Sequence, residues 1–313
     1  METSSPVPPA ITLTPPEFDF VIVGAGTAGC VLAHRLSALP SAPSVCVLER
    51  GLPNTDARWN ISMPAAFTYN RFFDFASTAD LWLRYRTEPV PTLRVTGTGG
   101  SRAVECPEGI GWGGTSALNA MIFMRGQAAD FNRWAADEWC GPQWDYAHLL
   151  PFFKRIETYT AGTLGGERAI DRDVESRYGL QELSNFRGSD GPMRVTSTRH
   201  LLYDFPRVPS TQASFPRAFI EAGLQAGLRY NPDFNAARPD GVGWVDVNVS
   251  NGERQSAAVS YLKPALARPN LKVISNALVS KVIIEGIVEI NTDTSSCVYT
   301  FKFLVSMQVD TVS

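Results

Sequence analysis

Three glycines near the N-terminus, Gly24, Gly26 and Gly29, lie between a β-rich run, FDFVIV, and a segment of helical periodicity, TAGCVLAHRLSAL. In the spacing G-x-G-x-x-G the first glycine permits a tight turn, and the last lets the helix pack closely on the strand. The middle glycine lets a pyrophosphate approach the backbone, where the helix N-terminus offers free N–H groups. The pattern therefore predicts a dinucleotide site. The alternative is a glycine-rich turn that serves packing alone.

A carboxylate follows at the distance that such a site needs. SVCVLERG has the composition of a second buried strand, so strand, turn, helix and strand form a βαβ unit. Glu49 closes this strand about 20 residues after Gly29 and can accept hydrogen bonds from ribose hydroxyls. An acid here disfavours the 2′-phosphate of NADP, so FAD and NAD are the two candidates left.

A second glycine-rich stretch, GIGWGGTSALNAMIFMRG at residues 109–126, turns apolar around a single amide. Small residues occupy Gly113, Gly114, Thr115 and Ser116, so the backbone there can lie against a flat ring system or a phosphate. A β-hairpin or bulge without a ligand is the alternative. Asn119 is placed either to orient a polar edge of a ligand or to cap the turn that follows.

The composition excludes several classes of protein. The chain has 313 residues, 44% hydrophobic and 19% charged, which is typical of a globular protein large enough for two domains. Its formal charge is −3 and it has no basic block, so we expect no nucleic-acid partner. It has no apolar run of membrane-spanning length and no recognisable signal peptide, so we expect a cytoplasmic protein without a membrane partner. The five cysteines have no metal-ligand or disulfide spacing, which indicates free thiols and no metal site.

Several motifs occur together in one order along the chain. They are VIVGAGTAGCVLAHRL, VLERG, WLRYRTEPVP, GWGGTSALNAMIFMRG, ADFNRWA, GSDGPMRV, PDFNAARPDGVG and SAAVSYLKPALARPNLKVISNALVSKVIIEG. In these motifs the chain resembles the glucose–methanol–choline (GMC) family of flavin oxidoreductases, over about residues 18–286. The resemblance implies an α/β fold: a Rossmann-like, GMC-type FAD-binding domain and an incomplete second, substrate-binding α+β domain. It also implies that the dinucleotide is FAD.

The resemblance assigns roles to residues on the adenosine side of the cofactor. Thr27 and Ala28 correspond to residues at the FAD pyrophosphate. Glu49 and Arg50 correspond to residues at the adenosine ribose, and the backbone of Val279 to a position that touches the adenine.

On the flavin side, the stretch from Gly113 corresponds to backbone that passes along the ring, and residues 119–122 (NAMI) to a segment near the isoalloxazine. Trp82 matches an aromatic residue near the cofactor. The expected cofactor-binding residues are therefore Gly24, Gly26, Thr27, Ala28, Gly29, Glu49, Arg50, Trp82, Gly113, Gly114, Thr115, Ser116, Asn119, Ala120, Met121, Ile122 and Val279.

Two positions depart from the family pattern. Leu118 stands where some members carry a histidine that attaches the flavin covalently, so we expect non-covalent FAD. Ile110 replaces a basic residue, which removes a local charge contact.

The resemblance also implies a domain division. The expected FAD-binding domain is discontinuous, with residues 18–60, 95–157 and 241–286. Residues 61–94 form a loop-rich excursion, and residues 158–240 form a partial substrate-binding domain. Residues 1–17 are expected to be a flexible leader, and residues 287–313 a divergent tail that leaves apolar surface exposed.

The implied activity is oxidation of the CH–OH group of a small alcohol, which needs a base to take the hydroxyl proton. The family's base is a histidine in a later signature that this chain lacks, so we expect no catalytic residue here and an inactive isolated chain. The three histidines, His34, His148 and His200, are poor substitutes. The alternatives are a non-catalytic flavin-binding remnant, an interaction protein, or an NAD-dependent dehydrogenase that uses the βαβ unit alone.

Overall fold

The computed structural model describes residues 17–53, 59–68, 79–94, 101–137, 140–160, 183–198, 214–287 and 300–308. The expected leader except Glu17, most of the expected tail, His200 and Cys297 lie outside these ranges. Within them, no helix is long and apolar enough to cross a membrane.

A three-stranded parallel sheet forms the centre of the N-terminal part. Its strand order is β1-β2-β13, with Val21 opposite Cys46 and Cys46 opposite Lys272. Helix α1 connects the first two strands, so the expected βαβ unit is confirmed. The elements are β1 (Phe20–Val23), α1 (Thr27–Leu36), β2 (Val45–Leu48) and β13 (Leu271–Ile274).

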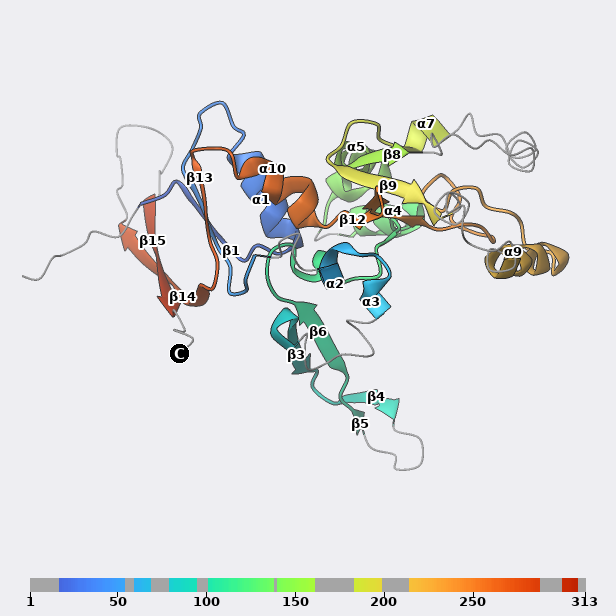
Figure 1. The fold of residues 1–313 in the computed structure, drawn as a ribbon, viewed down its shortest axis with the longest axis horizontal. Helices are drawn as coiled ribbons and strands as arrows, with labels where there is room; N and C mark the ends of the chain where they lie inside the picture. The colour runs from blue at the N-terminus through green and yellow to red at the C-terminus, as the bar shows by residue number, and fades with distance from the viewer. Residues whose placement is uncertain are drawn as a thin grey trace, which may run out of the picture.

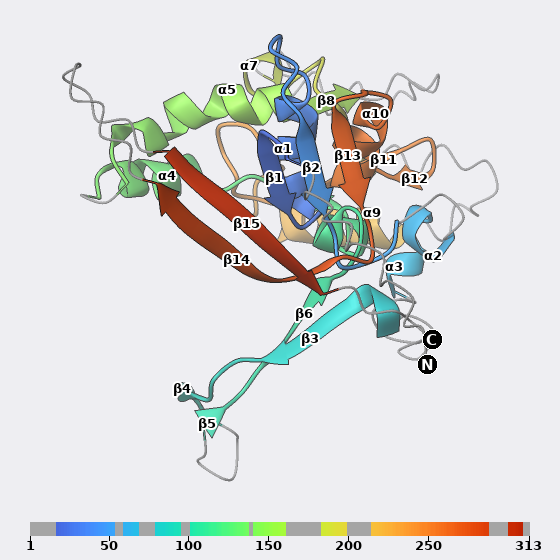
Figure 2. The ribbon, with the colours of Figure 1, turned by 90° about the vertical axis from the view of Figure 1, so that its left-hand side faces the viewer.

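Different elements lie on the two sides of this sheet. One face carries α1 together with the π-helical turn η6 (Ala258–Leu262) and the short helix α10 (Lys263–Ala265). On the other side lies an antiparallel hairpin of β14 (Leu278–Ile287) and β15 (Thr300–Gln308) (Figures 1 and 2). The helical layer buries Ile22 of β1, whereas Val21 and Val23 of this edge strand remain exposed.

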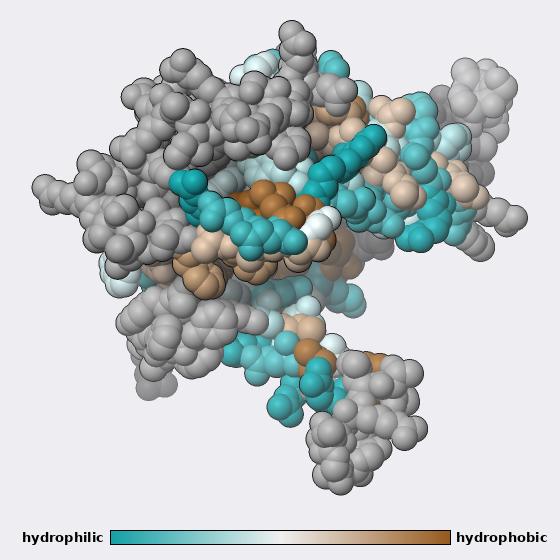
Figure 3. All heavy atoms as spheres, turned by 90° about the vertical axis from the view of Figure 1, so that its right-hand side faces the viewer, coloured by the Kyte–Doolittle hydropathy of each residue, from teal (hydrophilic) through white to brown (hydrophobic). Residues whose placement is uncertain are grey.

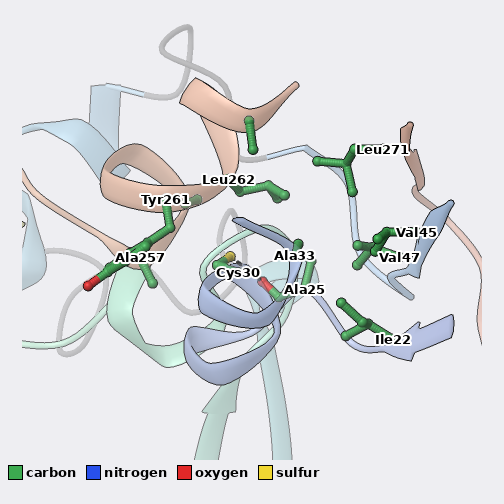
Figure 4. Packing of buried hydrophobic residues seen from close by; sticks show 12 residues of the cluster. Ile22, Ala25, Cys30, Ala33, Val45, Val47, Ala257, Tyr261, Leu262 and Leu271 are labelled. Atoms are coloured by element: carbon green, nitrogen blue, oxygen red, sulfur yellow. Dashed lines mark hydrogen bonds between the residues drawn. The ribbon is translucent and has the colours of Figure 1, made fainter. Parts of the chain in front are cut away.

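The core between sheet and helices is closely packed (Figure 4). Small α1 residues, Cys30 and Ala33, face the sheet and let the helix approach Val45 and Val47. Tyr261 joins the same cluster from η6. The burial of the Cys30 thiol raises its pKa to about 12, which makes it unreactive, as expected of a buried free thiol.

A second, mixed sheet contains four strands in the order β7-β10-β9-β8. Its strands are β7 (Ile122–Phe123), β8 (Glu157–Thr160), β9 (Met193–Ser197) and β10 (Asp246–Val247). It takes strands from ranges assigned above to both domains, because the chain passes back and forth between them. The helical segments of this part are α4 (Ala128–Ala135), η4 (Pro142–Trp144), α5 (Tyr146–Ile156), α7 (Leu183–Phe186) and α9 (Ser214–Gln225).

The excursion is more regular than the sequence indicates. Its strand β3 (Trp82–Arg86) pairs with β6 (Glu105–Gly109), from the range expected for the FAD-binding domain. The two form an antiparallel ribbon, with Trp82 opposite Gly109, that projects from the body (Figures 1 and 2). Prolines and threonines between its strands hide the alternation that would predict it. The remaining elements are α2 (Trp59–Ser62), α3 (Ala66–Thr68), η2 (Ala79–Leu81), β4 (Val90–Arg94), β5 (Ser101–Arg102), η3 (Gly114–Ala117), β11 (Val249–Ser250) and β12 (Glu253–Arg254).

Candidate dinucleotide site

The loop between β1 and α1 needs its glycines. Gly24 has φ +95° and donates its N–H to the carbonyl of Leu48 at 2.7 Å. A Cβ on Gly29 would lie 2.0 Å from the carbonyl oxygen of Gly24, so helix and loop approach as closely as predicted. A Cβ on Gly26 would meet no atom within 4 Å, so the middle glycine faces open space.

The N-terminus of α1 is free to bind an anion. Gly26 is the N-cap, and no side chain among the described residues caps the helix. The first turn contains no acidic residue, and Thr27 and Ala28 are exposed. The first backbone N–H groups of a helix have no partner within it and lie at the positive end of its dipole. This end of α1 therefore fits a pyrophosphate.

The buried carboxylate of Glu49 ties three segments together. One oxygen accepts the N–H of Ala25 at 2.7 Å, and the other accepts those of Gly51 and Gly111 at 2.8 and 3.1 Å. A carboxylate has about four acceptor positions, so these bonds leave room for a further donor such as a ribose hydroxyl. The sequence did not predict that the Glu49 carboxylate joins these segments, because Gly111 lies 62 residues further along the chain.

The adenosine-side residues gather at the end of β2. The N–H of Ala277 donates to the carbonyl of Glu49 at 2.8 Å, and that of Asn276 to the carbonyl of Gly51 at 3.0 Å. These bonds place the start of β14, with half-buried Val279, beside Glu49 and exposed Arg50.

The second glycine stretch crosses the fingerprint loop. The N–H of Gly113 donates to the carbonyl of Ala25 at 2.7 Å, and a Cβ on Gly114 would lie 2.9 Å from the Cα of Gly26. Both glycines have positive φ, +90° and +51°. The stretch is a buried 3₁₀ turn, η3, and so it is neither the hairpin nor the bulge considered above. Thr115 is exposed, whereas Ser116 is buried and its hydroxyl donates to the carbonyl of Gly113 at 2.6 Å.

Beyond η3 the chain presents an exposed amide. Asn119 and Ala120 are exposed, and the Asn119 side-chain oxygen accepts the N–H of Met121 at 3.0 Å. Met121 is buried with φ +62°, and Ile122 is exposed again. The side chain of Asn119 thus caps a turn and also faces outward.

Arg254 was not predicted as a site residue. Its guanidinium donates from Nη1 to the carbonyl and to the side-chain oxygen of Asn119, at 2.6 and 2.9 Å. No spacing or motif in NGERQSAA singles it out.

Trp82 is placed differently from the other expected residues. It is buried in an apolar cluster with Ile61, Leu81, Ala117 and Leu118. Its ring therefore supports η3, and Leu118 occupies the same cluster.

The two histidines that the structure describes make packing and hydrogen-bond contacts away from this site. His34 packs edge-on against Tyr261, and its carbonyl accepts a hydrogen bond from Arg268. Burial and Arg268 lower the pKa of His34. His148 is exposed and contacts Asp145, which caps α5. Neither histidine belongs to the group of residues described above.

Comparison with known proteins identifies the family to which this fold belongs. Residues 18–299 match the sequence model of the GMC oxidoreductase family. The chain belongs to the GMC oxidoreductases. The match extends to residue 299, past Gly286, where we expected the resemblance to end.

Similar GMC proteins include two choline dehydrogenases. The mitochondrial enzyme of Homo sapiens is 38% identical over 277 residues, and the oxygen-dependent enzyme of Staphylococcus xylosus is 36% identical over 274 residues. Each alignment covers 86% of this chain but 39% and 40% of the relative. The chain thus spans about 40% of the length of these curated relatives.

Solved structures of similar proteins agree with the assignment to this family. Pyridoxine 4-oxidase from Mesorbium loti is 31% identical with a TM-score of 0.61, over 84% of this chain and 43% of that one. An FAD-dependent oxidoreductase from Chaetomium thermophilum has a TM-score of 0.64 over 93% of this chain and 44% of its own, and at 24% identity it shows likeness of fold alone. The expected GMC-type α/β fold is confirmed. GMC oxidoreductases are FAD-binding flavoproteins, so the dinucleotide of this fold is FAD.

Proposed function

We propose that this chain binds FAD without a covalent bond and forms the cofactor-binding part of an oxidoreductase that acts on the CH–OH group of small alcohols. The observation that carries the proposal is the crossing of two glycine segments at the uncapped end of α1. There Gly113 bonds to Ala25, and a Cβ on Gly26, the N-cap of α1, would meet no atom within 4 Å.

Each side of this crossing has a role in the proposal. The first turn of α1, with Thr27 and Ala28, would hold the pyrophosphate. Glu49, Arg50 and the backbone of Val279 would hold the adenosine. The glycine stretch from Gly113 and the exposed segment at residues 119–122 would lie along the flavin. Buried Trp82 would act by supporting η3.

The chemistry follows from the family. FAD, when bound, accepts a hydride from the alcohol carbon, and the protein must supply a base for the hydroxyl proton. Among the described residues neither histidine lies at this site, so we propose that the chain alone does not turn over alcohols. Choline is the first substrate to test for a complete protein, because the similar curated proteins are choline dehydrogenases. A cytoplasmic location is part of the same proposal.

A flavin-binding protein without catalysis is the second candidate, and the position of the two histidines favours it for the isolated chain. The test is to purify the protein, desalt it and record its visible spectrum. We expect flavin absorption that passes into the supernatant on denaturation and is not bleached by choline under anaerobic conditions. A protein that takes up NAD but no FAD would contradict the proposal, and bleaching by choline would contradict the inactivity of the chain.

A further inference from the structure

Arg254 connects three segments that are far apart in the sequence. The residue is 2% exposed. Nε donates to the carbonyl of Ile61 at 2.9 Å, while Nη1 reaches the carbonyl of Ser116 at 3.5 Å and both oxygens of Asn119. One guanidinium thus joins α2, the end of η3 and the exposed turn that follows η3.

Among the described residues, Arg254 has no anionic partner. All of its acceptors are neutral oxygens, and among the residues that the structure describes no carboxylate pairs with it. Its Nη2 is buried without a hydrogen-bond partner there. Burial lowers the pKa of this arginine to about 10. By contrast, buried Arg125 and Arg187 are both paired with Glu157.

A buried arginine without a carboxylate partner does not favour the stability of the fold. An unpaired buried charge carries a large desolvation penalty, so a neutral donor or an arginine–carboxylate pair would stabilise the fold better. The side chain that Arg254 holds, Asn119, is exposed at the place proposed for the flavin ring. A positive charge there lowers the energy of negative charge on a neighbouring ligand.

We propose that Arg254 is a positioning residue of the flavin site: it holds the turn at residues 116–121 and keeps an unpaired positive charge beside Asn119 that favours reduced FAD. This inference rests on the proposed function. Reduction of the ring by two electrons and one proton leaves a negative charge on it, and the charge of Arg254 would stabilise that form relative to the oxidised one. Nη1 of Arg254, bonded to the side-chain oxygen of Asn119, would fix this amide against the ring.

The first experiment compares Arg254→Met and Arg254→Lys with wild type, using the full chain loaded with FAD. Dithionite titration against a reference dye gives the ratio of reduced to oxidised FAD at a fixed potential. We expect Arg254→Met to lower this ratio at least tenfold, about 30 mV for a two-electron couple. Arg254→Lys keeps the charge and is expected to stay within threefold of wild type.

Arg268→Met is the matched control. Arg268 also donates to neutral oxygens, the carbonyl of His34 and the hydroxyl of Ser37, but at the C-terminal end of α1. We expect its loss to lower stability and to leave the ratio unchanged. An unchanged ratio in Arg254→Met, or an equal fall in Arg268→Met, would overturn the role of the charge.

The positioning role is tested with variants that leave the core filled. Arg254→Lys removes the guanidinium and Asn119→Ala removes the side-chain oxygen that accepts from its Nη1, and each is expected to weaken FAD binding about tenfold. The double variant is expected to be no weaker than either, because both changes remove one contact. Additive losses would overturn the positioning. A wild type that binds no FAD would overturn the proposed function itself, whereas normal binding with unaltered variants would overturn this inference alone.

Discussion

At the scale of single residues, the glycines of this site differ in what they exclude. A Cβ on Gly26 would meet no protein atom within 4 Å, so this position leaves room for a ligand. A Cβ on Gly114 would press on the backbone of Gly26 at 2.9 Å. Gly114 is therefore required by the packing of the protein against itself, even without a cofactor.

Replacing Gly114 with alanine tests this close approach. Gly252 is the control, since its φ of +76° is also left-handed but a Cβ there would meet nothing within 4 Å. We expect Gly252→Ala to lower the free energy of unfolding by about 1 kcal/mol. We expect Gly114→Ala to lower it by about 1–3 kcal/mol more, because backbone atoms must move apart. Urea denaturation measures both, and equal losses would show that the contact is unimportant.

At the scale of elements, a buried charge network holds the second sheet together. Arg187 forms a two-pronged pair with Asp233 at 2.8 and 2.7 Å, and it also bonds to Glu157 of β8 and Asp246 of β10. Arg125 bonds to Glu157 at 2.8 Å from the segment after β7. Three carboxylates share two guanidinium groups, so one carboxylate is under-compensated.

The under-compensated group is Asp246, and its titration predicts a pH dependence of stability. Burial raises the pKa of Asp246 from 3.8 to about 6, against the opposing effect of Arg187. Between these values the folded state holds a proton that the unfolded state has lost. Its contribution to the free energy of unfolding therefore falls as pH rises through this window, by at most about 3 kcal/mol. His34 has the opposite effect, since its pKa is lowered on folding.

The contribution of Asp246 is isolated by comparison with Asp246→Asn, which cannot titrate. We expect the stability of wild type relative to this variant to decrease between pH 4.5 and 7, as measured by urea denaturation. Asp240→Asn, at an exposed aspartate of a nearby loop, is expected to keep the wild-type profile. A pH-independent difference between wild type and Asp246→Asn would contradict the assignment.

At the scale of the whole molecule, large apolar side chains lie on the surface. Figure 3 shows the side of the molecule on which α9 lies. Apolar residues gather in the middle of this face, between bands of hydrophilic residues. Phe215 and Phe219 of α9 are 78% and 66% exposed. The edge strand β1 also exposes Phe20, Val21 and Val23. Exposed apolar surface of this kind favours association between chains.

Replacing Phe215 and Phe219 together with serine is expected to reduce self-association without unfolding. Exposed positions change stability by less than about 0.5 kcal/mol, so light scattering across a concentration series reports association alone. Ile220→Ser is the matched control on the same helix, because Ile220 is buried with Tyr230 and Val242. We expect this control to lose about 2–5 kcal/mol of stability. Unchanged scattering in the double variant would place the association elsewhere.

The βαβ unit, the dinucleotide fingerprint and the family can be predicted from the amino-acid sequence alone. These features are local: glycines a few residues apart shape one turn, and apolar periodicity marks each neighbouring strand and helix. The order of such motifs is specific, because each must follow the last along one chain.

The contacts between these segments, in contrast, are set by the packing of the folded chain. The contact of Gly114 with Gly26, the bond from Gly111 to Glu49 and the hold of Arg254 on Asn119 each join residues far apart in the sequence. Such contacts follow from how the chain crosses itself, and neither periodicity nor spacing encodes them. That is why the sequence predicted the glycines of the candidate site, but neither the contacts of Arg254 nor the hydrogen bonds by which Glu49 joins three segments.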